Sequence, residues 1–449
     1  MKRFLSVIIA LTLVVAMLAA CASNPSAPSS SVPDASGGDN TPVAQDATFT
    51  FLHYHNPAEN QGTAAAYSLA AEKFELENPS IKVVKEFVAH DDYESNLKVL
   101  MAGDSLPDVF LAKGDVISQL ADANVIIPLE DEVKADSDWY NGFVEGADYD
   151  GSYNGHWYAL PFQMQSNMVI TYNSEILKEV GYDSFPTVHD DWVTLIGKLK
   201  DAGYTPIALG NVARWVAESC LFNTFSYRFV TGEWFESLKN NQGAKFTDDA
   251  FVQSLTKFQE LAQIGAFNQD MNSIDNMEQK TLYYNKKAAM FIEGAWSLGD
   301  LIANAPQDVK NATEFANMPE VVGAGGDKDT VAGGAGWGYC VNAKLTGENK
   351  AAALSFIKAI TDSDYAGYAA SMSFVAASKT TSVDEAGLDP LFAKYLKVAE
   401  TMKFAPIYDV ALPSAVGEEL YAKTQELLIG SVTPQQMAEE CQRVLEANY

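Results

Sequence analysis

The sequence is poor in cysteine, in histidine and in positive charge. It has 4 cysteines and 5 histidines among 449 residues, and only 30 lysines and arginines against 59 aspartates and glutamates. The formal net charge of −29 repels nucleic acids and anionic membranes, so it argues against binding to either. Cys220, Cys340 and Cys441 are far apart and form no C-x-x-C motif. We therefore interpret them as buried apolar residues rather than as metal ligands or nucleophiles.

Long apolar runs are absent except at the N-terminus. Lys2 and Arg3 precede an uncharged apolar run, residues 4–20, and Cys21 follows it directly. This pattern is typical of a secretory signal peptide. The letters LAAC that end at Cys21 resemble a bacterial lipobox, in which the cysteine carries a lipid; an ordinary cleavage site is the alternative. No later stretch approaches the roughly 20 apolar residues that span a bilayer, so we expect attachment to the membrane through the lipid anchor only.

The segment after this cysteine lacks aromatic residues altogether. Residues 22–47 consist mainly of serine, proline, alanine, glycine and aspartate, and such a composition buries too little apolar surface to fold. A flexible chain of about 25 residues has an end-to-end distance of roughly 28 Å. The sequence therefore predicts a signal peptide at 1–20 and a lipidated cysteine with a disordered tether at 21–46, on the extracellular face of a bacterial cell membrane.

The remaining part of the chain alternates between strand-like and helix-like segments. It is too long for one hydrophobic core, so two or more domains are expected. Its first predicted elements are, in order, a strand at 48–55, a helix at 62–79, a strand at 81–88, a helix from the N-cap Asp91 to Gly103, and a strand at 107–113. This order favours parallel strands in an α/β sheet covered on both faces, with ligands bound beyond the carboxyl ends of the strands.

Polar residues follow two of these strands. His53, His55 and Asn56 end the first strand, and Asp115 follows the third. Alternation along a strand places both imidazoles on one face, but no carboxylate or cysteine motif nearby completes a metal site, so we predict neither a metal nor a cofactor. Asp115 is a candidate to hydrogen-bond a ligand, and a simple helix cap is the alternative.

The letters AWSLG at residues 295–299 permit two interpretations. They differ by one methyl group from the G-x-S-x-G motif that exposes a catalytic serine, which would make Ser297 the nucleophile of an esterase. A hydrolase of that fold needs a histidine after the nucleophile, whereas all five histidines precede it. The other interpretation makes Trp296 an apolar plate at the end of a strand, positioned to stack on a ligand. A core indole is the alternative.

Five segments of the chain carry a resemblance to a known family. They are FELENPSIKVV (74–84), SLPDVFLAKGDVISQLADANVIIPL (105–129), NGHWYALPFQMQSNMVITYNSEILKEVG (154–181), NKKAAMFIEGAWSLGDL (285–301) and GGAGWGYCVNAK (333–344). In this order they resemble the extracellular solute-binding proteins of carbohydrate ABC importers, the group that includes maltose-binding protein. One local departure is PTVHDDW, which ends at Trp192, where many relatives read proline, threonine, tryptophan; we expect this indole in a helix core.

The resemblance implies a fold and a function. The fold is two α/β lobes joined by hinge strands, in the class II arrangement of periplasmic binding proteins, that close over a sugar held between them. Carried over to this chain, the first lobe comprises 47–160 with 333–378, and the second comprises 161–332 with 379–449. The function implied is that of a monomeric substrate-binding component that delivers a sugar or oligosaccharide to the transmembrane subunits of an ABC permease, without catalysis.

A sugar site combines aromatic plates with polar side chains. The C–H faces of a pyranose lie on aromatic rings, while its hydroxyls need fixed donors and acceptors. Trp296 matches the family position that stacks on sugar. The other ligand-binding candidates, each with a core or capping role as its alternative, are Trp215, Arg214, Gln163, Gln165, Asp115, His53, Asn56 and Trp337.

Other functions stay open at this point. A lipid-anchored glycoside hydrolase would also stack sugars on aromatic rings, with Glu293 or Asp300 as half of a carboxylate pair. The same fold also binds non-sugar solutes such as polyamines, iron or peptides, or presents a ligand to a membrane sensor. The sequence contains no local cluster of carboxylates or of tyrosine with histidine that favours these cargoes.

Overall fold

The computed structural model describes residues 46–56, 62–164, 168–380 and 387–449. The predicted signal peptide, the tether with Cys21 and the candidate Gln165 lie outside these ranges. Within them, every helix is too short or too polar to span a bilayer. The described chain forms two α/β lobes, each with its own sheet and its own core.

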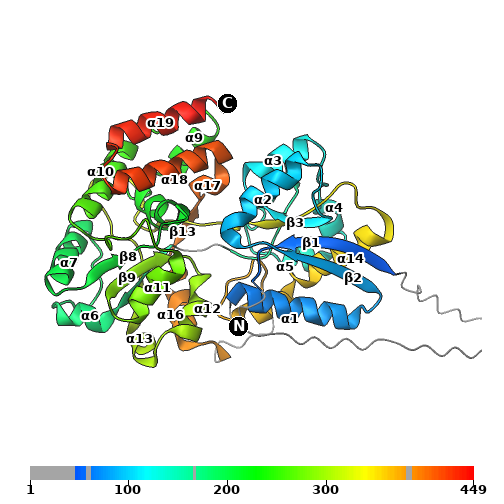
Figure 1. Cartoon of the computed structure of the whole chain (residues 1–449), viewed down its shortest axis with the longest axis horizontal. Helices are drawn as coiled ribbons and strands as arrows, with labels where there is room; N and C mark the ends of the chain where they lie inside the picture. Colours follow the sequence, from blue (N-terminus) through cyan, green and yellow to red (C-terminus); the bar gives the residue numbers. More distant parts are fainter. Residues whose placement is uncertain (1–45, 57–61, 165–167, 381–386) are drawn as a thin grey trace, which may run out of the picture. The chain divides into compact units, whose positions relative to one another are not determined.

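The first lobe is built on a five-stranded sheet with the order β2-β1-β3-β12-β6. Its elements are β1 (Ala47–His53), α1 (Gly62–Glu77), β2 (Ile81–Phe87), α2 (His90–Ala102), β3 (Val109–Ala112), α3 (Asp115–Asp122), α4 (Glu130–Lys134), α5 (Ser137–Gly142), η1 (Tyr149–Gly151), β4 (Ser152–Tyr153), β5 (His156–Trp157), β6 (Leu160–Pro161), β12 (Gly338–Val341), α14 (Gly347–Ala359) and α15 (Ser363–Ser371). β1 pairs in parallel with β2 and β3, which confirms the predicted β-α-β-α-β unit. α1 and α2 lie on opposite sides of this sheet (Figure 1).

The second lobe is built on a four-stranded sheet with the order β10-β7-β9-β8. Its elements are β7 (Val169–Asn173), α6 (Ser174–Glu179), α7 (His189–Asp201), β8 (Thr205–Ala208), η2 (Val216–Phe222), α8 (Asn223–Ser226), α9 (Gly232–Lys239), α10 (Asp249–Gln263), α11 (Asn276–Tyr284), β9 (Ala288–Glu293), α12 (Ser297–Asn304), α13 (Gln307–Ala312), β10 (Thr313–Ala316), β11 (Thr330–Ala332), α16 (Pro390–Ala399), β13 (Lys403–Ala405), α17 (Tyr408–Ala411), α18 (Ser414–Leu428) and α19 (Pro434–Glu446). α18 and α19 run side by side (Figure 1).

Aromatic and aliphatic side chains fill the cores of the two lobes, and the inner strands β3, β9 and β12 are buried at every position. In the first lobe, the rings of Phe49 and Phe51 pack on Phe356 of α14, with centroids 5.6 and 5.4 Å apart. In the second lobe, Trp192 of α7 is fully buried, as the sequence predicts, and shares its core with Cys441 of α19. Cys220, Cys340 and Cys441 are all buried free thiols, which confirms their interpretation as apolar residues.

Two helix starts show how well local patterns predict capping. At the start of α19, the Thr433 hydroxyl accepts a hydrogen bond from the Gln436 amide, and the Gln436 side chain accepts one from the Thr433 amide. This is the capping box that the sequence predicts. The predicted cap of α2 is wrong: the helix begins at His90 with Ala89 as N-cap, and Asp91 lies in the first turn. Its carboxylate instead contacts His90 and Trp215.

Candidate functional site

Aromatic side chains from both lobes meet at the ends of β1, β2 and β9. Trp215 and Trp296 of the second lobe lie with their ring centroids 6.2 Å apart. Trp215 meets His90 of the first lobe at 5.9 Å, and His90 meets Tyr54 at 5.1 Å and Trp337 at 6.2 Å. We call these five residues the aromatic cluster. Three of them, Trp215, Trp296 and Trp337, are residues that the sequence predicts for a sugar site.

The turn after β9 positions Trp296. The strand ends at Glu293, and Trp296 is the N-cap residue of α12, partly exposed and packed against the cores of both lobes. Its ring covers Gly294: a Cβ on that glycine would lie 2.1 Å from a ring carbon, so no other residue fits there. The Ser297 hydroxyl is buried and donates a hydrogen bond to the Gly294 carbonyl at 2.9 Å. Ser297 therefore holds the turn together and is not presented as an exposed nucleophile.

Trp215 reaches the first lobe through a hydrogen bond. Its indole Nε1 donates to Asp91 Oδ1 over 3.4 Å, and Asp91 also pairs with His90 Nδ1 at 3.2 Å. The hydrogen bond from His90 holds the pKa of Asp91 below its ordinary value, against the effect of burial. The preceding residue, Arg214, adopts the left-handed φ of 70° and pairs with Glu418 at 2.9 Å. Asp91 thus contacts the other lobe instead of capping α2.

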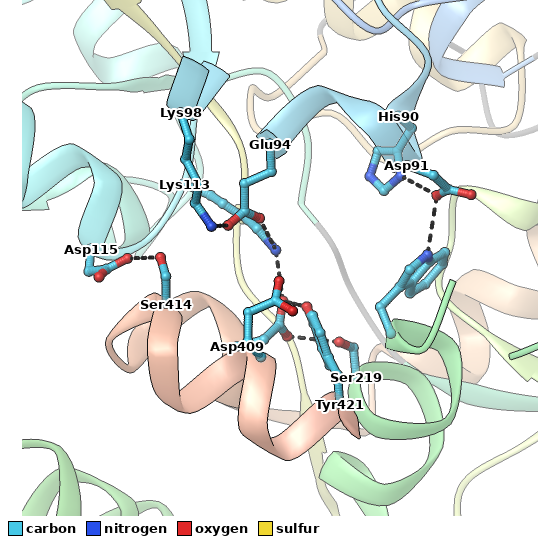
Figure 2. A network of polar contacts seen from close by, with 12 residues as sticks. His90, Asp91, Glu94, Lys98, Lys113, Asp115, Ser219, Asp409, Ser414 and Tyr421 are labelled. Carbon is cyan, nitrogen blue, oxygen red and sulfur yellow. Dashed lines mark hydrogen bonds and ion pairs between the residues drawn. The ribbon is translucent and has the colours of Figure 1, made fainter. Parts of the chain in front are cut away.

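A cluster of buried charges lies next to these aromatic residues, and Figure 2 shows most of it. Lys113, directly after β3, pairs with Asp409 of α17 at 2.8 Å and lies 3.8 Å from Glu94 of α2. Ser219 donates to Asp409 Oδ1 at 2.8 Å, and the Tyr421 hydroxyl donates to Asp409 Oδ2. Burial opposes the ionisation of Asp409, but the charge of the Lys113 ammonium and the hydrogen bonds from Lys113, Tyr421 and Ser219 together outweigh it and lower the pKa of this carboxyl.

Glu218 lies in the same cluster, and its pKa is shifted in the opposite direction from that of Asp409. It belongs to η2, a turn of π-helix, a geometry that is frequent at functional sites. It is fully buried; the Ser219 hydroxyl donates to its Oε2 at 3.2 Å, while its Oε1 has no hydrogen-bond partner among the described residues. Burial, and then the charge of Asp409, raise the pKa of Glu218 well above its ordinary value. Burial therefore favours the protonated form of Glu218, in which the carboxyl group can donate as well as accept a hydrogen bond.

His53 lies on the opposite face of β1 from the aromatic cluster. It faces a cavity of about 350 Å³. The residues that line this cavity are His53, His55, Tyr67, Ser68, Glu72, Lys85 and Phe87. Burial, and then the charge of Lys85, lower the pKa of His53 to about 4, and burial lowers that of His55 well below its ordinary value. Both imidazoles are therefore neutral at neutral pH. Tyr54, between them in sequence, points to the other face.

The remaining candidates lie in three different environments. Asp115 accepts hydrogen bonds from Gln119 at 2.9 Å and from Ser414 of the second lobe. Gln163 is buried, and its backbone bridges to Ala376 beside the first sheet. Asn56 is partly exposed at the end of the segment that follows β1. The structure therefore brings Asp115 to the contact between the lobes and leaves Gln163 buried beside the first sheet.

Trp337 is 4% exposed and belongs to the core of the first lobe. It contacts Tyr93 and Tyr54 edge-on, both at 5.4 Å, and the Lys113 ammonium lies 5.4 Å from the centre of its ring. Trp337 is thus the buried member of the aromatic cluster and lies next to the buried charges.

Sequence reasoning missed several residues of this region. Tyr54 and His90 stand at the carboxyl ends of β1 and β2, so the rule that ligands bind beyond those ends could have identified them. Asp409 and Tyr421 belong to α17 and α18 and carry no local signal. They come next to Lys113 only through the tertiary fold.

The carboxylates of the alternative glycosidase interpretation are engaged inside the second lobe. Gln279 donates to Glu293 Oε1 at 2.6 Å, and Lys280 lies 3.9 Å from Glu293 and 3.4 Å from Asp300. Tyr284 also donates to Asp300 at 2.8 Å. Among the described residues, no three histidine, cysteine, aspartate or glutamate side chains are grouped to hold a metal ion.

Comparisons with known proteins agree with this architecture. A family model described as bacterial extracellular solute-binding protein matches residues 57–367. An uncharacterized ABC transporter extracellular-binding protein of Pyrococcus horikoshii is 28% identical over 244 residues, which are 53% of this chain and 54% of that protein. The maltotriose-binding protein of Pyrococcus abyssi is 22% identical over 274 residues, which are 59% of this chain and 55% of that protein. The chain spans about half the length of these curated relatives.

A solved structure shows the same fold over nearly the whole length. A chitin oligosaccharide binding protein matches with a TM-score of 0.80 at 24% identity, and the alignment covers 90% of this chain and 98% of that one. The two proteins thus share the two-lobed α/β fold although their sequences are only 24% identical. Because the family model covers more than half of its residues, the chain belongs to the bacterial extracellular solute-binding protein family.

Proposed function

We propose that the chain is the extracellular substrate-binding component of an ABC transporter, and that it captures a sugar or an oligosaccharide between its lobes for delivery to a membrane permease. The observation that carries this proposal is the aromatic cluster, to which both lobes contribute rings. A sugar stacked on Trp215 and Trp296 would be buried further when Tyr54 and His90 approach from the first lobe. Such a ligand binds the closed arrangement better than the open one and shifts the population toward it.

Polar groups beside the aromatic cluster support a hydroxylated ligand. Asp91 is an ionised acceptor, Arg214 is a partly exposed donor, and Glu218 is a buried carboxyl group with a raised pKa and one oxygen that has no hydrogen-bond partner among the described residues. Sugar hydroxyls need both donors and acceptors once water is excluded, and this set offers both. A hydrocarbon ligand would offer these groups no hydrogen bond, whereas a buried polar group left unpaired costs about 1–3 kcal/mol.

The organisation of the whole chain follows from the same proposal. We place the first lobe at 47–160 with 333–378 and the second at 161–332 with 379–449. We propose that lipid on Cys21 anchors a monomer to the outer face of the cell membrane, and that residues 22–46 act as the tether. The permease binds the closed form, and no cofactor takes part. The relatives that bind maltotriose and chitin oligosaccharides support a carbohydrate cargo.

Thermal-shift screening of the full chain tests the cargo. The panel contains oligosaccharides, monosaccharides, polyols, amines and short peptides. A ligand at 100 times its Kd stabilises the folded state by about 2.7 kcal/mol, so a true cargo raises the melting temperature by several degrees. Stabilisation by amines or peptides but by no sugar would contradict the carbohydrate assignment. Release of reducing ends from the best oligosaccharide during the assay would contradict a purely binding role.

A further inference from the structure

Three consecutive residues after β3 contact the second lobe. Lys113 forms the ion pair with Asp409, and Asp115 accepts a hydrogen bond from Ser414, the first residue of α18 (Figure 2). Between them, Gly114 lies directly against the carbonyl group of Val410. The segment 113–115 therefore docks on the segment 409–414 through two side chains and one backbone contact.

Only glycine permits the central contact. Gly114 has a φ of 58°, in the left-handed region, and a Cβ placed on it would lie 2.3 Å from the Val410 carbonyl oxygen. Any side chain there would separate the two segments. The close approach of the two backbones brings Lys113 and Asp115 within reach of their partners at the same time.

Each half of the ion pair is held in place by its own lobe. On the first lobe, Glu94 of α2 and the ring of Trp337 flank the Lys113 ammonium, at 3.8 and 5.4 Å. On the second lobe, Ser219 and Tyr421 donate hydrogen bonds to Asp409. The side chains are 14% and 5% exposed, so the pair is shielded from water when the lobes touch. Preorganised charges lose little conformational entropy on pairing, and screening by salt is weak at such burial.

We propose that residues 113–115 and 409–414 form a latch that stabilises the closed arrangement of the lobes through protein contacts rather than through the ligand. The latch adds a fixed bias to the equilibrium between open and closed forms. Since the apparent affinity of a ligand scales with the population of the competent form, the latch also tunes ligand affinity. This second consequence rests on the proposed sugar-binding function, whereas the first does not.

Lys113→Met tests the latch, because it removes the charge and keeps a long apolar chain. Lys350→Met is the matched control: Lys350 belongs to α14 and pairs with Glu132 of α4 at 2.8 Å within the first lobe, away from the latch. Hydrogen exchange of the full chain without sugar is followed by mass spectrometry. We expect Lys113→Met to accelerate exchange in 113–118 and in 408–417 by at least about fivefold, the lower end of typical coupling between sites. Equal exchange in the two variants would overturn the latch.

A second variant covers the case in which Lys113→Met disturbs its own lobe. Ser414→Ala removes the donor to Asp115 from the other side, and Asp115 keeps its hydrogen bond from Gln119. We expect faster exchange in 113–118 with an unchanged melting temperature. Unchanged exchange at 113–118 in Ser414→Ala would overturn the proposal whatever Lys113→Met does.

The affinity consequence is measured separately on the best sugar of the screen. Lys113→Met should weaken binding by at least about fivefold, while Lys350→Met leaves it unchanged. If exchange responds as expected and no sugar binds any variant, the latch stands and the carbohydrate function fails. If exchange does not respond and sugar still binds the wild type, the function stands and the latch fails.

Discussion

Substitution of Trp296 by alanine separates the binding role of the indole from a structural one. The ring is partly exposed and tilted by 57° against its neighbour Trp215. A sugar on one ring face would remove about 100 Å² of apolar surface from water, which corresponds to roughly 2.5 kcal/mol or about 70-fold in affinity. Trp296→Ala should therefore weaken binding of the best sugar by one to two orders of magnitude, as calorimetric titration would measure.

The structure also sets the expected cost in stability. The indole covers Gly294 and touches both cores, so its removal should lower the free energy of unfolding. A fully buried tryptophan costs about 3–5 kcal/mol on truncation, and a partly exposed one should cost less. The variant should stay folded, with a melting temperature lowered by a few degrees in the absence of ligand.

Two control variants complete this experiment. Trp234 is also partly exposed, but it stacks on Phe251 at 5.4 Å inside the second lobe, so Trp234→Ala should lower stability and leave affinity unchanged. Ser297→Ala removes only the hydrogen bond to the Gly294 carbonyl, so about 1 kcal/mol of stability and little affinity should be lost. Full affinity in Trp296→Ala would refute the stacking argument, and loss of a measurable turnover in Ser297→Ala would revive the esterase interpretation.

Three further predictions concern the anchor, the lobes and one buried acid. Cys21→Ala should release the protein into the medium or block its maturation at unchanged ligand affinity; equal membrane retention in fractionation would contradict lipidation. Small-angle scattering should show a smaller radius of gyration at saturating sugar, and an unchanged radius would argue for a rigid site. Burial raises the pKa of Asp150 to about 6, above its unfolded value near 3.9, so the free energy of unfolding should fall by up to roughly 1.4 kcal/mol per unit as the pH rises from about 4 to 6. Asp150→Asn should remove that slope in urea titrations, and an unchanged slope would exclude Asp150 as its source.

The sequence predicts the local elements around the site closely. The strands expected at 48–55, 81–88 and 107–113 are β1, β2 and β3, with ends that differ by at most two residues. Their parallel pairing also follows from the sequence, because a helix between two strands provides the crossover connection that parallel strands need. Trp296 could be placed at a strand end from the letters around it, since the apolar run AAMFIE is typical of a buried strand and the glycine after it is typical of a turn.

Other features depend on which face of an element a residue occupies. His53 is the last residue of β1 and Tyr54 follows it directly, yet His53 faces a cavity beside α1 and Tyr54 joins the aromatic cluster. Alternation predicts that they separate but not which of the two faces meets the other lobe. Trp337 is likewise buried because of the tertiary fold: it directly precedes β12, which pairs with β3 in the first sheet.

The sequence by itself therefore determined the secondary structure, the family resemblance and the aromatic character of the site, because these depend on neighbours along the chain. Only the tertiary structure decided the polar partners. Lys113 and Asp409 are 296 residues apart, and Asp91 bonds to Trp215 across 124 residues instead of capping its helix. A charged side chain pairs with an opposite charge that the fold brings within about 4 Å, and the local sequence pattern does not predict which residue that is.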